Sequence, residues 1–481
     1  MYKRRFIPLF LYYPGAKLLD PGVDQMKRIL SITALALLLA STLSGCLFKS
    51  AEELYSLPEL SEDYTNLQDE IESLVTSGLE YAGPKSGDNT QAIQFQDLDG
   101  DGEDEVLAFF HEENSSDTKP LHIYIYSKTE EDLYESVAEI DGEGSSFHSI
   151  EYVDLDGSGT LELVVNYQIS DGVYSLCAYS IEDYMVTTLM QSSCSSYVVT
   201  DLDEDEIYEI ILLQQDSTGE TGDRAEWYLN SGDSMSLEGS ANLSSDIVTI
   251  NRARSSKLAE GEPAVYVTST WGEEEEQLIT DIFALQDGVL TNLTLEEDSG
   301  ISSSTLREDS EGEIFATDIN EDGIYEIPLA TELGTSDIWQ VDWMQYCLDG
   351  TAEKICTTLC APEIGDGWYL ELPDTFWDSF SDSLGISKEQ LASGEEIVVT
   401  LYDCSDTGSE SEGSEDTTYI ELLSIYTITG DNRETRADFT GRYTLYEGSD
   451  TIYAFSLETD SGLTQAQIED GFHFMPISWS E

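Results

Sequence analysis

The sequence has few basic residues. It contains 20 Lys and Arg against 98 Asp and Glu, which gives a formal net charge of −78. A surface with this charge repels phosphate, so we expect no binding to nucleic acid and no electrostatic binding to anionic lipid. It attracts divalent cations, and self-repulsion opposes compaction unless counter-ions relieve it. Solubility or a salty habitat is the alternative explanation of the charge, and it does not exclude metal binding.

Motifs of known catalytic sites are also lacking. No HExxH, GxSxG, P-loop or GxGxxG sequence occurs in a fitting context, and the chain has only four histidines. We therefore assign no catalytic residue and expect binding rather than catalysis. A carbohydrate-active or other hydrolase is the alternative, because so many acidic residues make any single Asp/Glu pair uninformative.

Cysteine is scarce and shows no CxxC spacing of the kind that binds zinc. Apart from Cys46, disulfides and buried free thiols are both compatible with the spacing. The six residues concerned are Cys177, Cys194, Cys347, Cys356, Cys360 and Cys404.

The N-terminal region is typical of a targeting segment. From Met26 it reads MKRILSITALALLLASTLSGC, with two basic residues and then an apolar run too short to cross a membrane comfortably. Its end, residues 43–46, resembles the lipobox of bacterial lipoproteins. This resemblance implies cleavage before Cys46, acylation of its thiol, and an exported protein that is lipid-anchored on the outer face of the cell membrane. Met26 is the expected start, and an ordinary signal peptide with an incidental Cys46 is the alternative.

A nine-residue acidic pattern occurs four times. Each copy has Asp at position 1, Asp or Asn at position 3, Asp or Ser at position 5 and Glu at position 9. Strand-like runs flank each copy, so each predicts the turn of a β-hairpin. We call these segments acidic loops one to four: residues 97–105, 154–162, 201–209 and 318–326.

The spacing of these hairpins predicts the fold. Two more apolar runs follow each acidic loop, and a fifth unit without the acidic pattern spans residues 247–294. Four strands per unit at roughly 45–60 residues are typical of β-propeller blades. We therefore expect a mainly β protein with a propeller of about five visible four-stranded blades, and the number that closes the ring stays open.

The acidic loops predict calcium sites. Carboxylates at positions 1, 3 and 5 of a tight turn converge, the backbone carbonyl of position 7 adds an oxygen, and the Glu at position 9 closes the shell. An EF-hand would need Glu at position 12, where all four copies have an apolar residue within a strand. Acidic turns without metal are the alternative. The predicted ligands are Asp97, Asp99, Asp101, Glu103, Glu105, Asp154, Asp156, Ser158, Thr160, Glu162, Asp201, Asp203, Asp205, Ile207, Glu209, Asp318, Asn320, Asp322, Ile324 and Glu326.

This pattern resembles the calcium loops of VCBS/FG-GAP repeat proteins, including integrin-α-like propellers, over about residues 90–330. The Phe-Gly…Gly-Ala-Pro part of that repeat is absent. The whole chain resembles uncharacterised VCBS-repeat lipoproteins of Clostridia-type bacteria. The resemblance implies a β-propeller with Ca²⁺ between the first two strands of a blade, used for adhesion or ligand binding. The expected partner is an extracellular glycan, peptide or protein.

Four segments follow from these features. Residues 1–45 are the signal and upstream segment, and residues 46–84 are a tether with a short amphipathic helix, because apolar residues recur there at helical spacing. Residues 85–365 form the predicted propeller. Residues 366–481 form a predicted C-terminal α+β domain with helices near 388–393 and 464–471, and with a solvated tract at 405–416.

Overall fold

The computed structural model describes residues 62–475 except 113–117, 130–132, 217–221, 273–276, 309–313, 335–336 and 406–418. Cys46, the predicted signal segment and nearly all of the 405–416 tract lie outside the described residues. By its contacts the chain divides into Met1–Thr65 and Asn66–Glu481, and the sheets below belong to the second unit. No helix within the described ranges is long and apolar enough to cross a membrane.

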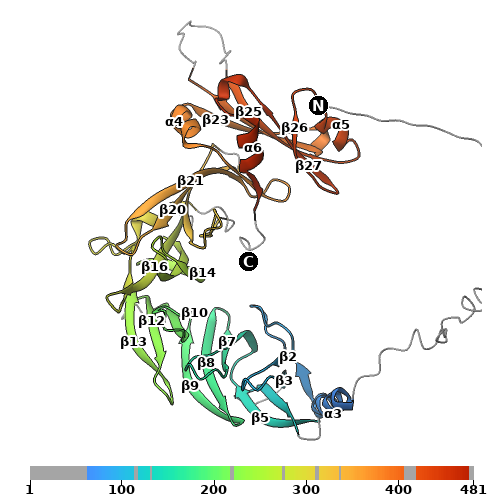
Figure 1. Ribbon diagram of the computed structural model, residues 1–481, viewed down its shortest axis with the longest axis vertical. Helices are drawn as coiled ribbons and strands as arrows, with labels where there is room; N and C mark the ends of the chain where they lie inside the picture. Colours follow the sequence, from blue (N-terminus) through green and yellow to red (C-terminus); the bar gives the residue numbers. More distant parts are fainter. Residues whose placement is uncertain are drawn as a thin grey trace, which may run out of the picture. The chain divides into compact units, whose positions relative to one another are not determined.

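The prediction of a mainly β protein is confirmed. The described part of the chain contains six antiparallel sheets, most of them meanders of strands that are consecutive in the sequence (Figure 1). Sheet one contains β1 (Leu79–Tyr81), β2 (Ile93–Gln96), β3 (Glu105–Glu112), β4 (Leu121–Lys128) and β5 (Tyr134–Gly142). Sheet two contains β6 (Ser146–Val153), β7 (Glu162–Ser170), β8 (Val173–Glu182) and β9 (Met185–Cys194).

The remaining sheets follow in chain order. Sheet three contains β10 (Ser196–Thr200), β11 (Glu209–Gln214), β12 (Arg224–Asn230) and β13 (Met235–Asn242). Sheet four contains β14 (Ile247–Lys257), β15 (Pro263–Trp271), β16 (Gln277–Gln286), β17 (Val289–Asn292) and β18 (Arg307–Glu308). Sheet five contains β19 (Glu326–Glu332), β20 (Trp339–Tyr346), β21 (Ala352–Ala361), β22 (Trp368–Glu371) and β28 (Phe472–Phe474). Sheet six contains β23 (Leu384–Leu391), β24 (Glu396–Asp403), β25 (Ile420–Thr429), β26 (Tyr443–Glu447) and β27 (Thr451–Leu457).

Four strands, namely β3, β7, β11 and β15, are buried on both faces. In β7 the side chains of Leu163 and Val165 pack with residues of sheet one, whereas Val164 between them packs with residues of sheet three. Successive side chains of a strand point to opposite faces, so this alternation requires a neighbouring sheet on each side. In β11 the even-numbered Ile210 and Leu212 likewise pack toward sheet two, and the odd-numbered residues pack with sheet four.

The first sheet buries its other face against a helix. α3 (Glu62–Ser77) places Leu67 and Ile71 against Val106, Ala108 and Phe110 of β3. These helix positions are four residues apart, so they lie on one face. The prediction of a short amphipathic helix before the sheets is confirmed.

Acidic loops one to three connect the two strands of a hairpin as predicted, namely β2–β3, β6–β7 and β10–β11, although in sheet one the short β1 precedes the hairpin. The fourth predicted hairpin is wrong in one respect. Its first strand, expected at 314–317, is reduced to a single bridge between Thr317 and Glu326. The next pair with hydrogen bonds in both directions would place Phe315 opposite Pro328, and proline has no N–H to donate.

The region 366–481 contributes to two sheets. β22 pairs with β21, and β28, from near the other end of this region, pairs with β22, so the predicted boundary after residue 365 falls inside sheet five. Three helices accompany sheet six: α4 (Asp374–Phe380), α5 (Arg433–Ala437) and α6 (Gln465–Gly471) (Figure 1).

One helix prediction in this region is confirmed and one is wrong. α6 is confirmed, and Thr464 caps it with a reciprocal capping box to Gln467. The expected helix at 388–393 falls largely in β23, which pairs with β24 from Leu384 to Leu391. Pairing along a whole neighbouring strand outweighs a weak local preference for helix.

The six cysteines left open by the sequence are free thiols. Cys177 and Cys194 lie on the adjacent strands β8 and β9, but they belong to different hydrophobic clusters. Burial raises the pKa of Cys194 to about 12, so this thiol behaves as a small apolar side chain.

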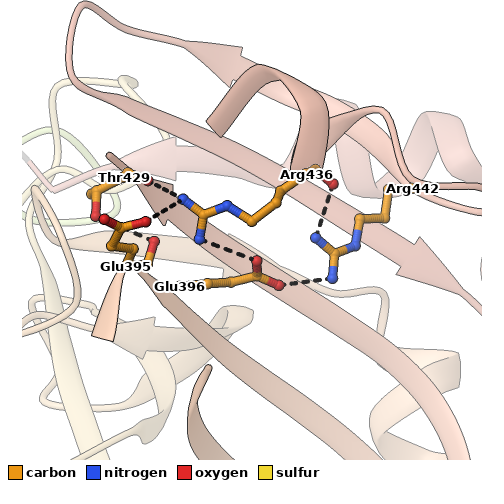
Figure 2. Close-up of polar contacts among 5 residues, drawn as sticks. All are labelled: Glu395, Glu396, Thr429, Arg436 and Arg442. Atoms are coloured by element: carbon orange, nitrogen blue, oxygen red, sulfur yellow. Dashed lines mark hydrogen bonds and ion pairs between the residues drawn. The ribbon is translucent and has the colours of Figure 1, made fainter. Parts of the chain in front are cut away.

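A buried ion-pair network holds sheet six to α5 (Figure 2). The side chain of Glu396 is only 4% exposed and contacts Arg442 Nη2 at 2.7 Å and Arg436 Nη1 at 3.6 Å. Arg436 also donates to the carbonyl of Thr429 and lies 3.3 Å from Glu395. Two guanidinium groups therefore share one buried carboxylate, and removing its charge leaves Arg436 with the more exposed Glu395 and weakens the compensation of both arginines.

Glu396→Gln is therefore expected to lower the free energy of unfolding by about 3 kcal/mol. Urea denaturation followed by circular dichroism measures the loss. Glu389→Gln, at an exposed position of β23, is the control and should change stability by less than about 0.5 kcal/mol. Equal effects of the two substitutions would show that the network contributes no net stability.

Candidate metal centre

The four acidic loops share one pattern of hydrogen bonds. The carboxylate of position 1 accepts from the N–H of position 6 in every copy, and its other oxygen accepts from the N–H of position 4 or 5. In loop one, Gly102 N–H donates to Asp97 Oδ2 at 3.0 Å and Gly100 N–H donates to Oδ1 at 2.8 Å. The position 6 bonds of the other loops are Gly159 to Asp154 (2.8 Å), Glu206 to Asp201 (3.1 Å) and Gly323 to Asp318 (2.7 Å).

The side chain of position 5 folds the loop further. In every copy its oxygen accepts a hydrogen bond from the backbone N–H of position 7. The bonds are Glu103 to Asp101 (2.8 Å), Thr160 to Ser158 (3.2 Å), Ile207 to Asp205 (2.9 Å) and Ile324 to Asp322 (2.9 Å). The four loops differ in sequence, but they share the hydrogen bonds of positions 1 and 5 and therefore a similar backbone conformation.

Positions 4 and 6 need a left-handed backbone. Loops one and two have glycine at both positions, with φ between 73° and 91°. Loop three has Glu204 at φ 61° and Glu206 at φ 71°, and loop four has Glu321 at φ 61°. Glu206 occupies a position where the left-handed backbone favours glycine. The backbone of loop three is not altered, so the left-handed glutamates carry the strain.

Carboxylate oxygens converge in three of the loops. In loop three, Asp201, Asp203, Asp205 and Glu209 each offer an oxygen, and these atoms lie within 4.8 Å of one another. Two oxygens on opposite sides of a calcium ion are about 5 Å apart, since each lies 2.3–2.6 Å from the metal. The donor set and its spacing therefore fit Ca²⁺. The corresponding groups in the other two loops are Asp97, Asp99 and Asp101, and Asp154, Asp156 and Glu162.

Loop four supplies a mixed set of oxygens. Asn320 replaces the aspartate of position 3, and its Nδ2 donates to Asp322 Oδ2 at 2.9 Å. Its amide oxygen accepts from the N–H of Asp322 at 3.1 Å. A calcium shell accepts amide oxygens as well as carboxylates, so this loop keeps the same donor type with less negative charge.

The glutamate of position 9 is buried in all four loops. One of its oxygens accepts from the N–H of position 2, at 3.1 Å for Glu105, 2.7 Å for Glu162, 2.7 Å for Glu209 and 3.0 Å for Glu326. Burial raises the pKa of Glu162 to about 7 and that of Glu209 to about 8, and the aspartates of the same loop add to the effect. A cation bound beside these glutamates would lower their pKa values, because it stabilises the ionised carboxylate.

Consecutive loops contact each other through the backbone. Leu161 N–H, at the end of loop two, donates to the carbonyl of Leu98 in loop one at 2.8 Å. Tyr208 N–H in loop three donates to the carbonyl of Asp154 in loop two at 3.3 Å. Loops one to three are therefore a connected row, and a change of conformation in one loop bears directly on the next.

The structure also brings together three side chains that the sequence did not single out as a group. His122 Nδ1 lies 2.9 Å from Asp141 Oδ1 and 3.5 Å from Glu139 Oε1. His122 faces Asp141 across the β4–β5 pair. The alternation of both strands is visible in the sequence, but their register is set by the hairpin, so sequence alone does not align them.

Comparison with known proteins gives no family. No protein-family model matches the chain, and no curated protein matches it. Solved structures match weakly. An exotype rhamnogalacturonan lyase, YesX, is 9% identical with a TM-score of 0.24, covering 61% of this chain and 73% of the lyase. A protein described as an exo-beta-1,3-galactanase from Bifidobacterium bifidum s17 is 11% identical with a TM-score of 0.22, covering 62% of this chain and 96% of the other.

The strain at position 6 of loop three predicts a stabilising substitution. Glu206→Gly should raise the free energy of unfolding by about 1 kcal/mol relative to Glu206→Ala, because both remove the same charge and only glycine relieves the left-handed Cβ. Calorimetric melting of the two variants in the presence of chelator measures the difference. An alanine variant as stable as the glycine variant would contradict the assignment of strain.

Proposed function

We propose that this protein is a membrane-tethered extracytoplasmic lipoprotein whose acidic loops bind Ca²⁺ and whose stacked sheets form a β-propeller used for ligand binding. The observation that carries the proposal is the conformation shared by the four loops. In each copy, position 1 accepts from the N–H of position 6, position 5 from that of position 7, and position 9 from that of position 2. In three of the copies this conformation brings carboxylate oxygens within 4.8 Å of one another, which is the spacing that a calcium shell requires.

The packing of the sheets supports the propeller. Sheets one to five each pack a hydrophobic face against the next sheet, through clusters that join one and two, two and three, three and four, and four and five. Blades of a propeller pack face to face in this way. The acidic loops then lie where the first strand of a blade turns into the second.

The charge of the chain supports calcium as a structural ion. With a net charge of −78, compaction costs electrostatic free energy that bound divalent cations reduce. The loops place this charge in groups of three or four carboxylates at hairpin ends. Calcium sites of extracellular modules typically bind in the range of about 0.1–1 mM, which matches a role in stability outside the cell.

Calcium should raise the melting temperature, because only the folded chain holds the ligands of each loop together. At about 10 mM Ca²⁺, each site of this affinity adds about 1.4–2.7 kcal/mol. Melting in Ca²⁺ and in chelator measures the effect. The double variant Asp203→Asn/Asp205→Asn should lose the part of the Ca²⁺-induced rise in melting temperature that loop three contributes. Asp233→Asn, in an exposed turn of the same sheet, should retain the full rise. Identical melting in both solutions would contradict calcium binding.

Cys46→Ser should release the protein from the membrane, because serine provides no thiol for acylation. Detergent-phase partitioning of the expressed chain and its variant measures the anchor. Cys404→Ser, at a thiol within the folded region, is the control and should leave partitioning unchanged. A Cys46→Ser variant that still enters the detergent phase would contradict the lipid anchor.

A further inference from the structure

A pocket lies where the first strands of three consecutive sheets meet. It has a volume of about 480 Å³ and is lined by residues 149–151 of β6, 197–199 of β10, 253–255 of β14 and the loop segment 87–89. Pockets that bind small molecules span about 300–1,000 Å³, so this one has the size of a ligand site. β6, β10 and β14 are edge strands of their sheets.

Edge strands give the pocket a polar wall. An edge strand presents backbone N–H and C=O groups away from its own sheet, and three such strands border this space. Asn89 from the loop segment already uses one of these groups, since its Nδ2 donates to the carbonyl of Ile150 at 3.1 Å. The loop segment is fixed on β6 in the same manner, because Ser86 N–H donates to the carbonyl of His148 at 2.9 Å.

The side chains of the pocket combine both signs of charge with neutral hydroxyls. Glu151 is half-buried, and its neighbours are Asp88, Arg254 and the hydroxyl of Tyr197. The Tyr197 hydroxyl also lies 2.9 Å from Ser149 Oγ. Burial raises the pKa of Glu151, and the hydrogen bond from Tyr197 opposes this rise. Arg254 is notable in a chain with 20 basic residues among 481.

The balance of charges selects the chemical class of the ligand. An anion would meet Asp88 and Glu151 within a chain of net charge −78, and a cation would meet Arg254. A neutral ligand with several hydroxyl groups can bond both the carboxylates and the guanidinium, because a hydroxyl donates to a carboxylate and accepts from a guanidinium. The hydroxyls and amide of the pocket add donors and acceptors without charge.

We propose that this pocket binds a neutral saccharide, a mono- or disaccharide unit of a glycan, through Glu151, Arg254 and the amide and hydroxyl groups beside them. This site deepens the binding role proposed above and rests on it. Glu151 accepts from sugar hydroxyls and Arg254 donates to them. β6, β10 and β14 are each paired to the next strand of their own sheet, which orders the backbone that carries these groups.

Saturation-transfer NMR on the full chain in Ca²⁺ tests the site. The probes are cellobiose, lactose, mannose and N-acetylglucosamine, with putrescine as the cationic probe and glucuronate as the anionic one. At least one neutral sugar is expected to receive saturation. Glu151→Gln and Arg254→Gln are expected to weaken its binding about tenfold or more, since each removes a hydrogen bond to a charged group.

Matched controls are available on β14 and on β5. Lys257→Gln lies on β14 beyond the pocket, and Glu135→Gln lies exposed on β5, so both should bind the sugar as the unmodified chain does. Melting temperatures check that each variant is folded, and because Arg254 is exposed its replacement keeps the test open if Glu151→Gln unfolds. Binding of none of the four sugars, binding of only a charged probe, or equal binding by pocket and control variants would overturn the proposal.

Failure of the pocket and failure of the proposed function give different results. If the chain melts at a higher temperature in Ca²⁺ but binds no sugar, only the saccharide proposal is overturned. If the chain binds a sugar through Glu151 and Arg254 but its melting temperature does not rise in Ca²⁺, only the calcium proposal is overturned. Hydrolysis of a bound disaccharide, measured as released reducing ends, would retain the saccharide site and overturn the role as a binding protein.

Discussion

Burial of β3, β7, β11 and β15 on both of their faces is the main constraint on this structure. A strand that is apolar on both faces is stable in water only between two other layers. In β7 and β11, neighbouring residues of one strand belong to the cores on either side. No sheet in this series has a complete core by itself, so the sheets stabilise one another in sequence. The first of them uses α3 as its outer layer.

This stacking places the acidic loops beside each other. The second strand begins at the glutamate of position 9, so burial of the strand draws that carboxylate under the loop, where it accepts from the backbone of position 2. The side chains of positions 1, 3 and 5, which are aspartates except for Ser158 in loop two and Asn320 in loop four, lie on the exposed side of the turn. The start of the strand therefore adds a buried carboxylate to an acidic loop. The proposed cation would reduce the electrostatic cost of this concentration of negative charge.

The loops and the proposed saccharide pocket share their supporting strands. Glu151 lies three residues before Asp154, and Val199 lies two residues before Asp201. The backbone bond between Tyr208 and Asp154 also links the loops that follow these strands. An ion in these loops would fix the ends of β6 and β10, and so the spacing of the pocket walls. Calcium bound in this arrangement would act on the proposed ligand site by making the strands rigid, without contacting the ligand.

The amino-acid pattern alone predicts the local features whose signal lies within a few residues. The hairpins of loops one to three, α3, α6 and the mainly β class all follow from spacing and alternation, because turn residues and apolar periods act locally. The tertiary structure decided the rest. Pro328 limited the fourth hairpin to one bridge because its partner strand would need the missing N–H. β28 joined sheet five by pairing with β22, about 100 residues away, and β23 became a strand because β24 lay beside it. The pocket of Glu151 and Arg254 is likewise formed by residues far apart in the chain, which no local pattern brings together.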